Sequence, residues 1–233
     1  MKIGVFGDSF AHTNFDTGKG WVSLLSKKYN VENYALTCTP LYYSYQKILE
    51  NINNIDIVIL AVTAPGRLYV PQVLPDLMPA NIGTIETILN DKDFIERSDS
   101  VKVEIFKSAR QYYLHLSNFE FDKCVHKLLL NDIRDICIKK NKKLIAIPAL
   151  YTDEIFTLFE EGFTLQEVFE LERKHWQLYG INKMEKEMQH HLSDENNLVL
   201  YEILATRLTT DNNRKYKLED FISKPIFRAS YFL

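Results

Sequence analysis

Three short apolar runs constrain the fold of this chain more than any other feature of its sequence. They span residues 3–6, 55–62 and 143–150, and they contain almost no polar alternation. Such runs are typical of strands that are buried on both faces of a sheet, and segments with helical spacing separate them. The sequence therefore predicts an α/β fold with a parallel central sheet covered by helices, in which 31–36 adds a weaker strand.

Amphipathic patterns predict the covering helices. Apolar residues recur at helical spacing in five segments, which are 18–30, 41–52, 118–141, 164–179 and 193–208. On the long third helix we expect the buried face to carry Phe121, Cys124, Leu128, Ile133 and Ile136. Ser193 is the expected N-cap of the last helix, because its side chain can accept a hydrogen bond from an unpaired N–H of the first turn.

Proline marks the segment that follows the 55–62 strand. Four of the seven prolines fall between positions 65 and 79, which excludes a regular helix there. We expect a loop-rich insertion over 64–100, which serves either as a wall beside a ligand or as a rigid packed loop. No domain boundary is visible, so 1–233 is predicted to form a single domain with 209–233 as a C-terminal extension.

Composition and charge exclude several classes of protein. The 28 basic and 31 acidic residues give a net charge of -3 without a basic stripe, so nucleic-acid binding is not expected. No apolar run approaches a membrane span, and the first residues hold too short an apolar run for a signal peptide. The three cysteines form no Cys-x-x-Cys pair, which argues against a structural zinc site and for a reducing compartment. We expect a cytoplasmic protein, although the sequence does not distinguish this from association with a virion.

The first apolar run ends abruptly in Gly7, Asp8 and Ser9. A residue after the first parallel strand lies at the edge of the sheet where ligands bind. We expect Ser9 at or near the start of a helix, where backbone N–H groups favour developing negative charge. Ser9 is then either a helix cap or a nucleophile, and a nucleophile needs a base.

The six histidines differ in how well they can supply that base. His12 follows Ser9 by three positions and would point away from a substrate if the helix continued. His115, His126 and His175 lie inside amphipathic helices, which favours surface or boundary positions. His190 and His191 lie just before the Ser193 cap, from which a side chain can reach the edge of the sheet, although both also fit solvated loop residues.

Three short motifs resemble the SGNH/GDSL hydrolases. They are FGDSF at 6–10, V-x-N-Y-A at 31–35 and H-L-S at 191–193, and the resemblance extends over residues 3–208. It implies a flavodoxin-like three-layer α/β/α sandwich and hydrolysis of a carboxylic ester, with an O-acetyl group on a carbohydrate as a candidate substrate. It implies no metal and no organic cofactor. The expected partner is thus a small-molecule or glycan ester, and the oligomeric state is left open.

The resemblance also implies roles for individual residues. Ser9 corresponds to the nucleophile, His191 to the general base and the backbone N–H of Ser9 to one oxyanion donor. Cys38 occupies the position of a family glycine that supplies a second backbone N–H. Asp8 is expected to accept hydrogen bonds from backbone N–H groups and to shape the turn.

Two further family positions differ in this sequence. The asparagine expected near 61–67 is missing, and either the Thr63 hydroxyl or the Arg67 guanidinium is a candidate replacement. Met188 occupies the place of the acid that orients His191, whereas Glu187 lies three positions before His190 and preserves the spacing with a longer side chain. A Ser-His dyad without an orienting acid, or orientation of the histidine by Asp194, is also left open.

These departures leave two other functions open. A binding or structural module that kept the fold without turnover is the main alternative. A nucleotide or flavin binder is disfavoured, because the chain has no G-x-G-x-x-G or Walker pattern.

Overall fold

The computed structural model describes residues 1–13, 18–73, 81–151, 163–178, 192–210 and 215–221. Within these residues, the central sheet has four parallel strands in the order β2-β1-β3-β4. Their bounds are Lys2–Phe6 for β1, Asn30–Asn33 for β2, Ile57–Val62 for β3 and Lys143–Pro148 for β4. This order matches the first four strands of flavodoxin-like sheets. The predicted parallel α/β sheet is confirmed.

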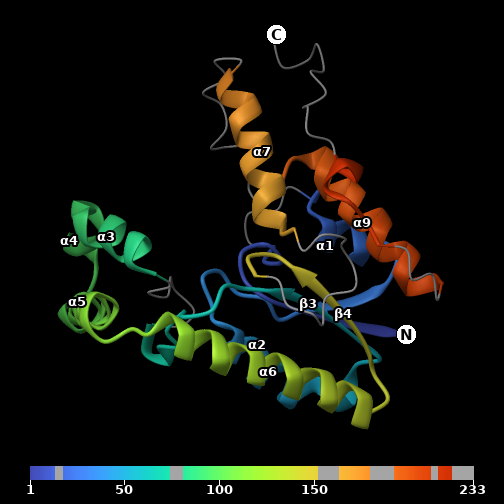
Figure 1. Ribbon diagram of the computed structural model, residues 1–233, viewed down its shortest axis with the longest axis horizontal. Helices are drawn as coiled ribbons and strands as arrows, with labels where there is room; N and C mark the ends of the chain where they lie inside the picture. Colours follow the sequence, from blue (N-terminus) through green and yellow to red (C-terminus); the bar gives the residue numbers. More distant parts are fainter. Residues whose placement is uncertain (14–17, 74–80, 152–162, 179–191, 211–214, 222–233) are drawn as a thin grey trace.

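Alternate side chains of the sheet face two separate cores. On β3, Ile57, Ile59 and Ala61 pack with helices α1 (Trp21–Ser26), α7 (Leu165–Leu178) and α9 (Asp194–Thr209). The intervening residues of β3 pack on the other side with α2 (Leu41–Asn51) and α6 (Phe119–Lys139). Helices therefore cover both faces of the sheet, as Figure 1 shows. The strands, these five helices and the short helix η1 (Ile52–Asn54) are called the sheet unit below.

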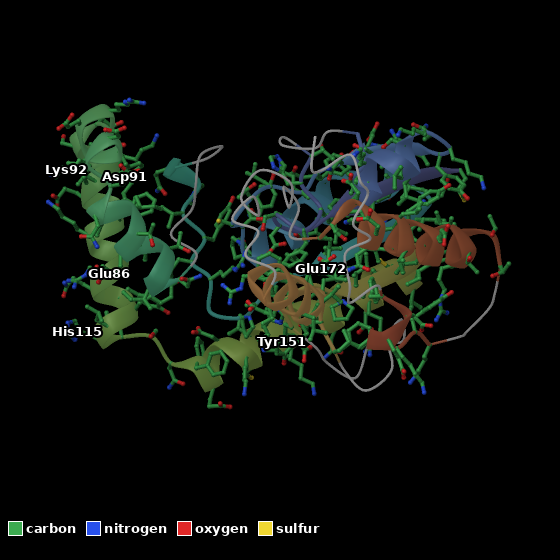
Figure 2. All side chains as sticks on the ribbon, turned by 90° about the horizontal axis from the view of Figure 1, so that it is seen from above. Glu86, Asp91, Lys92, His115, Tyr151 and Glu172 are labelled. Atoms are coloured by element: carbon green, nitrogen blue, oxygen red, sulfur yellow. The ribbon has the colours of Figure 1, made fainter. Side chains whose placement is uncertain are left out.

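The described residues of 64–100, which are 64–73 and 81–100, are more helical than the expected loop-rich insertion. A short helix η2 (Pro71–Val73) is followed by α3 (Ile82–Asn90), α4 (Lys92–Arg97) and α5 (Ser100–His115). Helices form here because no proline occurs between 80 and 147, and the side chains of Asn81, Asp91 and Asp99 cap the three N-termini. These three helices, called the helical unit below, project to one side of the sheet unit (Figures 1 and 2).

The predicted face of α6 is wrong in its N-terminal half. The buried positions are His126, Leu130, Ile133 and Cys137, whereas Phe121, Cys124 and Leu128 are exposed. The buried residues follow one another at intervals of four, three and four, which is the spacing of a single helix face. His126 therefore points into the molecule instead of lying at the surface.

The described part of the C-terminal extension packs on the sheet unit. It contains the short helix η3 (Leu218–Asp220), and Phe221 contacts Phe163 edge-on with ring centroids 6.0 Å apart. Phe221 is 3% exposed and belongs to the core on the α9 side of the sheet. Among the helices that the structure describes, none combines the length and apolar character that crossing a membrane requires.

Candidate active site

Gly7 allows the chain to leave β1 immediately beside β3. Its φ is +145°, and an added Cβ would lie 2.7 Å from the carbonyl oxygen of Ala61. Both the backbone angle and the close approach require glycine. The carbonyl of Gly7 accepts hydrogen bonds from the N–H of Leu36 and the hydroxyl of Thr39. The end of β1 is thus fixed to the loop that follows β2.

Ser9 lies in a single turn and does not begin a helix, so this expectation was wrong. The N–H groups of Ala11 and His12 both donate to the carbonyl of Asp8, at 3.0 Å each. The first helix, α1, starts only at Trp21. A single turn offers aligned N–H groups but not the full dipole of a helix. Ser9 is partly exposed at the carboxyl end of a strand that lies between β2 and β3.

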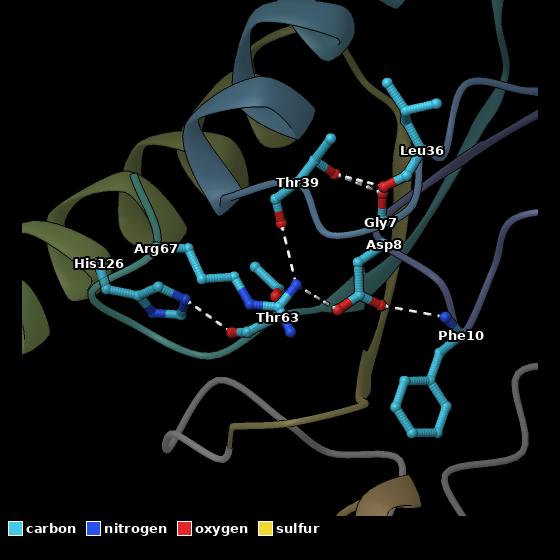
Figure 3. Close-up of polar contacts among 8 residues, drawn as sticks. All are labelled: Gly7, Asp8, Phe10, Leu36, Thr39, Thr63, Arg67 and His126. Carbon is cyan, nitrogen blue, oxygen red and sulfur yellow. Dashed lines mark hydrogen bonds and ion pairs between the residues drawn. The ribbon is translucent and has the colours of Figure 1, made fainter. Parts of the chain in front are cut away.

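Asp8, the residue before Ser9 in the chain, forms a buried ion pair with Arg67 (Figure 3). Nη1 of Arg67 lies 2.9 Å from Oδ2 of Asp8, whose side chain is 0% exposed. Oδ1 of Asp8 accepts a hydrogen bond from the N–H of Phe10 at 3.1 Å, which shapes the turn around Ser9. Nη1 of Arg67 also donates to the carbonyl of Thr39 at 3.3 Å. Arg67 thereby connects the segments that follow β1, β2 and β3.

Part of the Arg67 guanidinium is still available to a ligand. Within the described residues, Nε and Nη2 of Arg67 make no hydrogen bond. The side chain is 11% exposed. A guanidinium presents five N–H donors, so pairing with Asp8 does not exhaust them. The charge is nevertheless largely balanced by Asp8, which the sequence did not indicate.

Cys38 adopts a glycine-like backbone conformation. Its φ is +61°, in the left-handed region that residues with a side chain rarely occupy. Its N–H has no hydrogen-bond partner among the described residues. Burial raises the pKa of the thiol, while nearby Arg67 lowers it and Asp8 raises it. The thiol is thus held protonated, and the backbone N–H is the group of Cys38 suited to binding an oxyanion.

Thr63 and His126 form a buried pair at the end of β3 (Figure 3). His126 Nε2 donates to the carbonyl of Thr63 at 2.9 Å, and its ring packs edge-on against Tyr151 with centroids 4.7 Å apart. The hydroxyl of Thr63 is shielded from solvent and has no partner in the described part of the chain. Binding to a substrate oxygen would therefore require a local shift at Thr63. Sequence reasoning missed His126 because it misassigned the face of α6.

The remaining catalytic candidates lie outside the described residues. These are Glu187, His190 and His191. The structure describes the chain again from residue 192. Ser193 caps α9 as predicted, and its hydroxyl oxygen accepts a hydrogen bond from the N–H of Asn196 at 3.2 Å. His12, the local alternative, is held 3.0 Å from the Thr37 hydroxyl through Nδ1.

Glu172 is a buried carboxyl group that sequence reasoning did not single out. It lies on α7, is 2% exposed and accepts hydrogen bonds from the Ser193 N–H and the Asn196 side chain. Burial raises its pKa to about 7, although hydrogen bonds from Ser193 and Asn196 act in the opposite direction. The pattern around 164–179 contained one signal, since Leu165, Val168 and Glu172 recur at helical spacing on a buried face.

Comparisons with known proteins identify no family. No family model matches the chain, and no curated protein matches it. Among solved structures, the crystal structure of an acetyl xylan esterase, AlAXEase, is similar at 13% sequence identity and a TM-score of 0.35, covering 89% of this chain and 100% of that one. Likeness at this level carries no argument about activity. Within the described residues, no three His, Cys, Asp or Glu side chains gather as metal ligands.

Proposed function

We propose that the chain is a serine hydrolase of carboxylic esters, with Ser9 as the nucleophile. One observation carries the proposal. Ser9 follows the inner strand β1, and the loop that carries Cys38 is hydrogen-bonded to Gly7, two residues before Ser9. Cys38 itself has a left-handed backbone and an N–H without a hydrogen-bond partner among the described residues. A nucleophile next to a free backbone N–H is the arrangement that stabilises the oxyanion of acyl transfer.

The reaction divides into acylation and deacylation. A histidine, His191 or alternatively His190 with Glu187 as its orienting acid, takes the proton as Ser9 Oγ attacks the ester carbon. The N–H groups of Ser9 and Cys38 stabilise the resulting oxyanion. The intermediate collapses, the C–O bond to the alcohol breaks and the imidazolium returns the proton to the alcohol. Water, activated by the same histidine, then releases the acid and restores Ser9.

The aromatic surface near this site favours a carbohydrate O-acetyl ester as the substrate. Tyr69, two residues after Arg67, contacts Tyr42 at the start of α2 with ring centroids 5.2 Å apart. Tyr42 is 41% exposed, so part of this aromatic surface is accessible. Tyrosine offers rigid apolar faces with a polar tip, which suits the mixed surface of a sugar ring. Replacing Tyr69 with alanine is expected to raise KM for an acetylated sugar but not for p-nitrophenyl acetate.

A binding module without turnover is the alternative. It is favoured by the shielded hydroxyl of Thr63 and by the pairing of Arg67 with Asp8, since neither residue cleanly replaces the missing asparagine. Loss of one oxyanion donor costs about 10² to 10³ in rate, so slow turnover would also be consistent with these features.

Labelling with a fluorophosphonate probe tests the proposal. We expect covalent labelling of the wild-type protein and none of Ser9→Ala, whereas Ser26→Ala, which changes a hydroxyl bonded to the Val22 carbonyl in α1, should be labelled normally. Replacing the histidine that acts as the base should slow labelling by about 10² to 10⁴. Comparing the labelling rates of His191→Ala and His190→Ala therefore identifies the base. Absence of any Ser9-dependent label and of p-nitrophenyl acetate hydrolysis would favour the binding module.

A further inference from the structure

A chain of buried hydrogen bonds begins at the turn that contains Ser9. The indole Nε1–H of Trp21 donates to the carbonyl of Phe10 at 2.7 Å. The backbone N–H of the same Trp21 donates to Oδ1 of Asn197 at 3.1 Å. Trp21 is the first residue of α1 and Asn197 lies in the first turn of α9, so these bonds join the turn, α1 and α9.

The chain of bonds continues to the residues that follow the candidate bases. Nδ2 of Asn197 donates to the carbonyls of Leu192 and Ser193, at 3.0 Å each. The N–H of Ser193 donates to the carboxyl oxygens of Glu172 at 3.2 and 3.3 Å, and Nδ2 of Asn196 donates to the same group at 2.6 Å. The side-chain amide of Asn197 therefore links Trp21 to Leu192 and Ser193.

These groups are shielded from water. Trp21 is 1% exposed, Asn197 3% and Glu172 2%. Burying polar groups costs free energy unless they are hydrogen-bonded, and apolar side chains would pack α1 on α9 without this cost. A buried network whose members are bonded to one another fixes one arrangement of the elements that it joins. What it fixes here is the relation between Phe10, adjacent to Ser9, and Leu192, adjacent to His191.

We propose that Trp21 and Asn197 are positioning residues that hold the Ser9 turn and the Leu192–Ser193 turn in the relation that catalysis needs. The catalytic part of this inference rests on the proposed function. Neither residue needs to touch the substrate. They act by fixing the backbone on each side of the site, and a small displacement of reacting groups can cost about 10²-fold in rate.

Two substitutions interrupt the path at different places. Asn197→Asp keeps the oxygen that accepts from Trp21 but removes the amide donor to Leu192 and Ser193. Trp21→Phe keeps an aromatic ring and the backbone N–H but removes the donor to Phe10. Ile203→Val is the matched control, because Ile203 is buried in the same helix α9 and has no polar side-chain atom.

The readouts are the maximal rate of Ser9 labelling by a fluorophosphonate, the probe concentration that gives half this rate, and hydrogen exchange of the Trp21 indole N–H. We expect each interrupting variant to lower the maximal rate by about 10-fold to 100-fold while the half-saturating concentration stays within about twofold. Exchange at the Trp21 indole should accelerate in Asn197→Asp, because loss of the amide bonds to Leu192 and Ser193 loosens α9 against α1, and it should stay unchanged in Ile203→Val.

The possible outcomes separate this inference from the proposed function. If wild-type Ser9 is labelled and both interrupting variants behave like Ile203→Val, the positioning role is overturned and the proposed function stands. If wild-type Ser9 is not labelled at all, the proposed function itself is overturned, whatever the indole exchange shows.

Discussion

The sheet unit and the helical unit bury different kinds of side chain. In the sheet unit and the turn that follows β1, the side chains of Asp8, His126 and Glu172 are each less than 5% exposed. Within the described residues of the helical unit, no polar or charged side chain is buried. Its small core consists of four apolar residues, which are Ile85, Ile88, Phe106 and Ala109.

This difference shows where polar chemistry can be built. Burying an ionisable group costs free energy, and the two large cores of the sheet unit can offset that cost. The helical unit instead leaves apolar surface open. Leu68 and Val70 lie with Val101 and Ile105 of α5 along a groove of about 670 Å³. We therefore expect changes in the sheet unit to affect the whole fold, and changes in the helical unit to stay local.

The largest effect is expected for Gly7→Ala. The left-handed backbone contributes about 2 kcal/mol of strain and the clash with Ala61 about 3 kcal/mol, so the free energy of unfolding should fall by about 5 kcal/mol. Urea unfolding measures this loss. Gly18→Ala is the control, because Gly18 also has a positive φ but no described residue has an atom within 4 Å of an added Cβ. It should lose only about 1 to 2 kcal/mol. Equal losses would contradict the close approach of β1 to β3.

Arg67→Met should destabilise the protein by about 4 kcal/mol, since it leaves the buried carboxylate of Asp8 without its partner. The double variant Asp8→Asn, Arg67→Met removes the unpaired charge and should recover part of the loss. A double-mutant cycle from urea unfolding checks the coupling. A double variant no more stable than Arg67→Met would indicate that the ion pair does not account for the loss.

Glu172→Gln should change how stability depends on pH. The folded-state pKa of about 7 lies above the ordinary value of 4.5, so the folded protein holds a proton that the unfolded chain has released. The contribution of Glu172 is therefore greatest below pH 4.5 and is lost as pH rises through 7, by about 3 kcal/mol in total. Unfolding measured at pH 5 and 8.5 should show this loss in the wild type and not in Glu172→Gln. A constant stability difference between the two proteins would refute it.

Ile85→Ala should weaken the helical unit by about 2.5 kcal/mol through loss of buried apolar contacts. Ile85 is 0% exposed in the core shared by α3 and α5. Hydrogen exchange should then accelerate for amides of α3 and α5, while amides of β1 and β3 keep their protection. Loss of protection in the strands as well would mean that the two units unfold together.

The smallest effect is expected for Tyr113→Phe. The hydroxyl of Tyr113 accepts from the N–H of Leu68 at 3.1 Å and donates to the carbonyl of Gly66 at 2.9 Å, which ties α5 to the segment after β3. Losing these bonds should cost about 1 kcal/mol and expose the Leu68 amide to exchange. Tyr112→Phe is a matched control on the same helix. Equal exchange rates of the Leu68 amide in Tyr113→Phe and Tyr112→Phe would show that the hydrogen bonds of the Tyr113 hydroxyl do not protect this segment.

The sheet was readable from the sequence because its signal is local. Apolar residues on consecutive positions of 57–62 indicate a strand buried on both faces, whatever the rest of the chain does. Glycine at position 7 likewise marked a sharp exit from β1. That helices cover the sheet follows from the rule that parallel strands need crossover connections, whereas this rule does not set the strand order.

The candidate site was less predictable because its contacts are long-range. Arg67 and Asp8 are 59 residues apart, and nothing in either neighbourhood specifies the partner. On α6, Phe121 and Leu128 recur at the spacing of a buried face although both are exposed. The predicted buried face therefore did not include His126. The proposed base stays a prediction, since Glu187, His190 and His191 lie outside the described residues.

The segment 66–70 limits how this chain can vary in length. Arg67 and Tyr69 face the sheet unit, through Asp8 and Tyr42, whereas Leu68 between them packs on the helical unit. Insertion or deletion of one residue before Arg67 would displace Arg67 from Asp8, Leu68 from the helical unit and Tyr69 from Tyr42 at the same time. Relatives of this chain should accordingly tolerate gaps within the helical unit but keep the spacing between β3 and Tyr69 fixed.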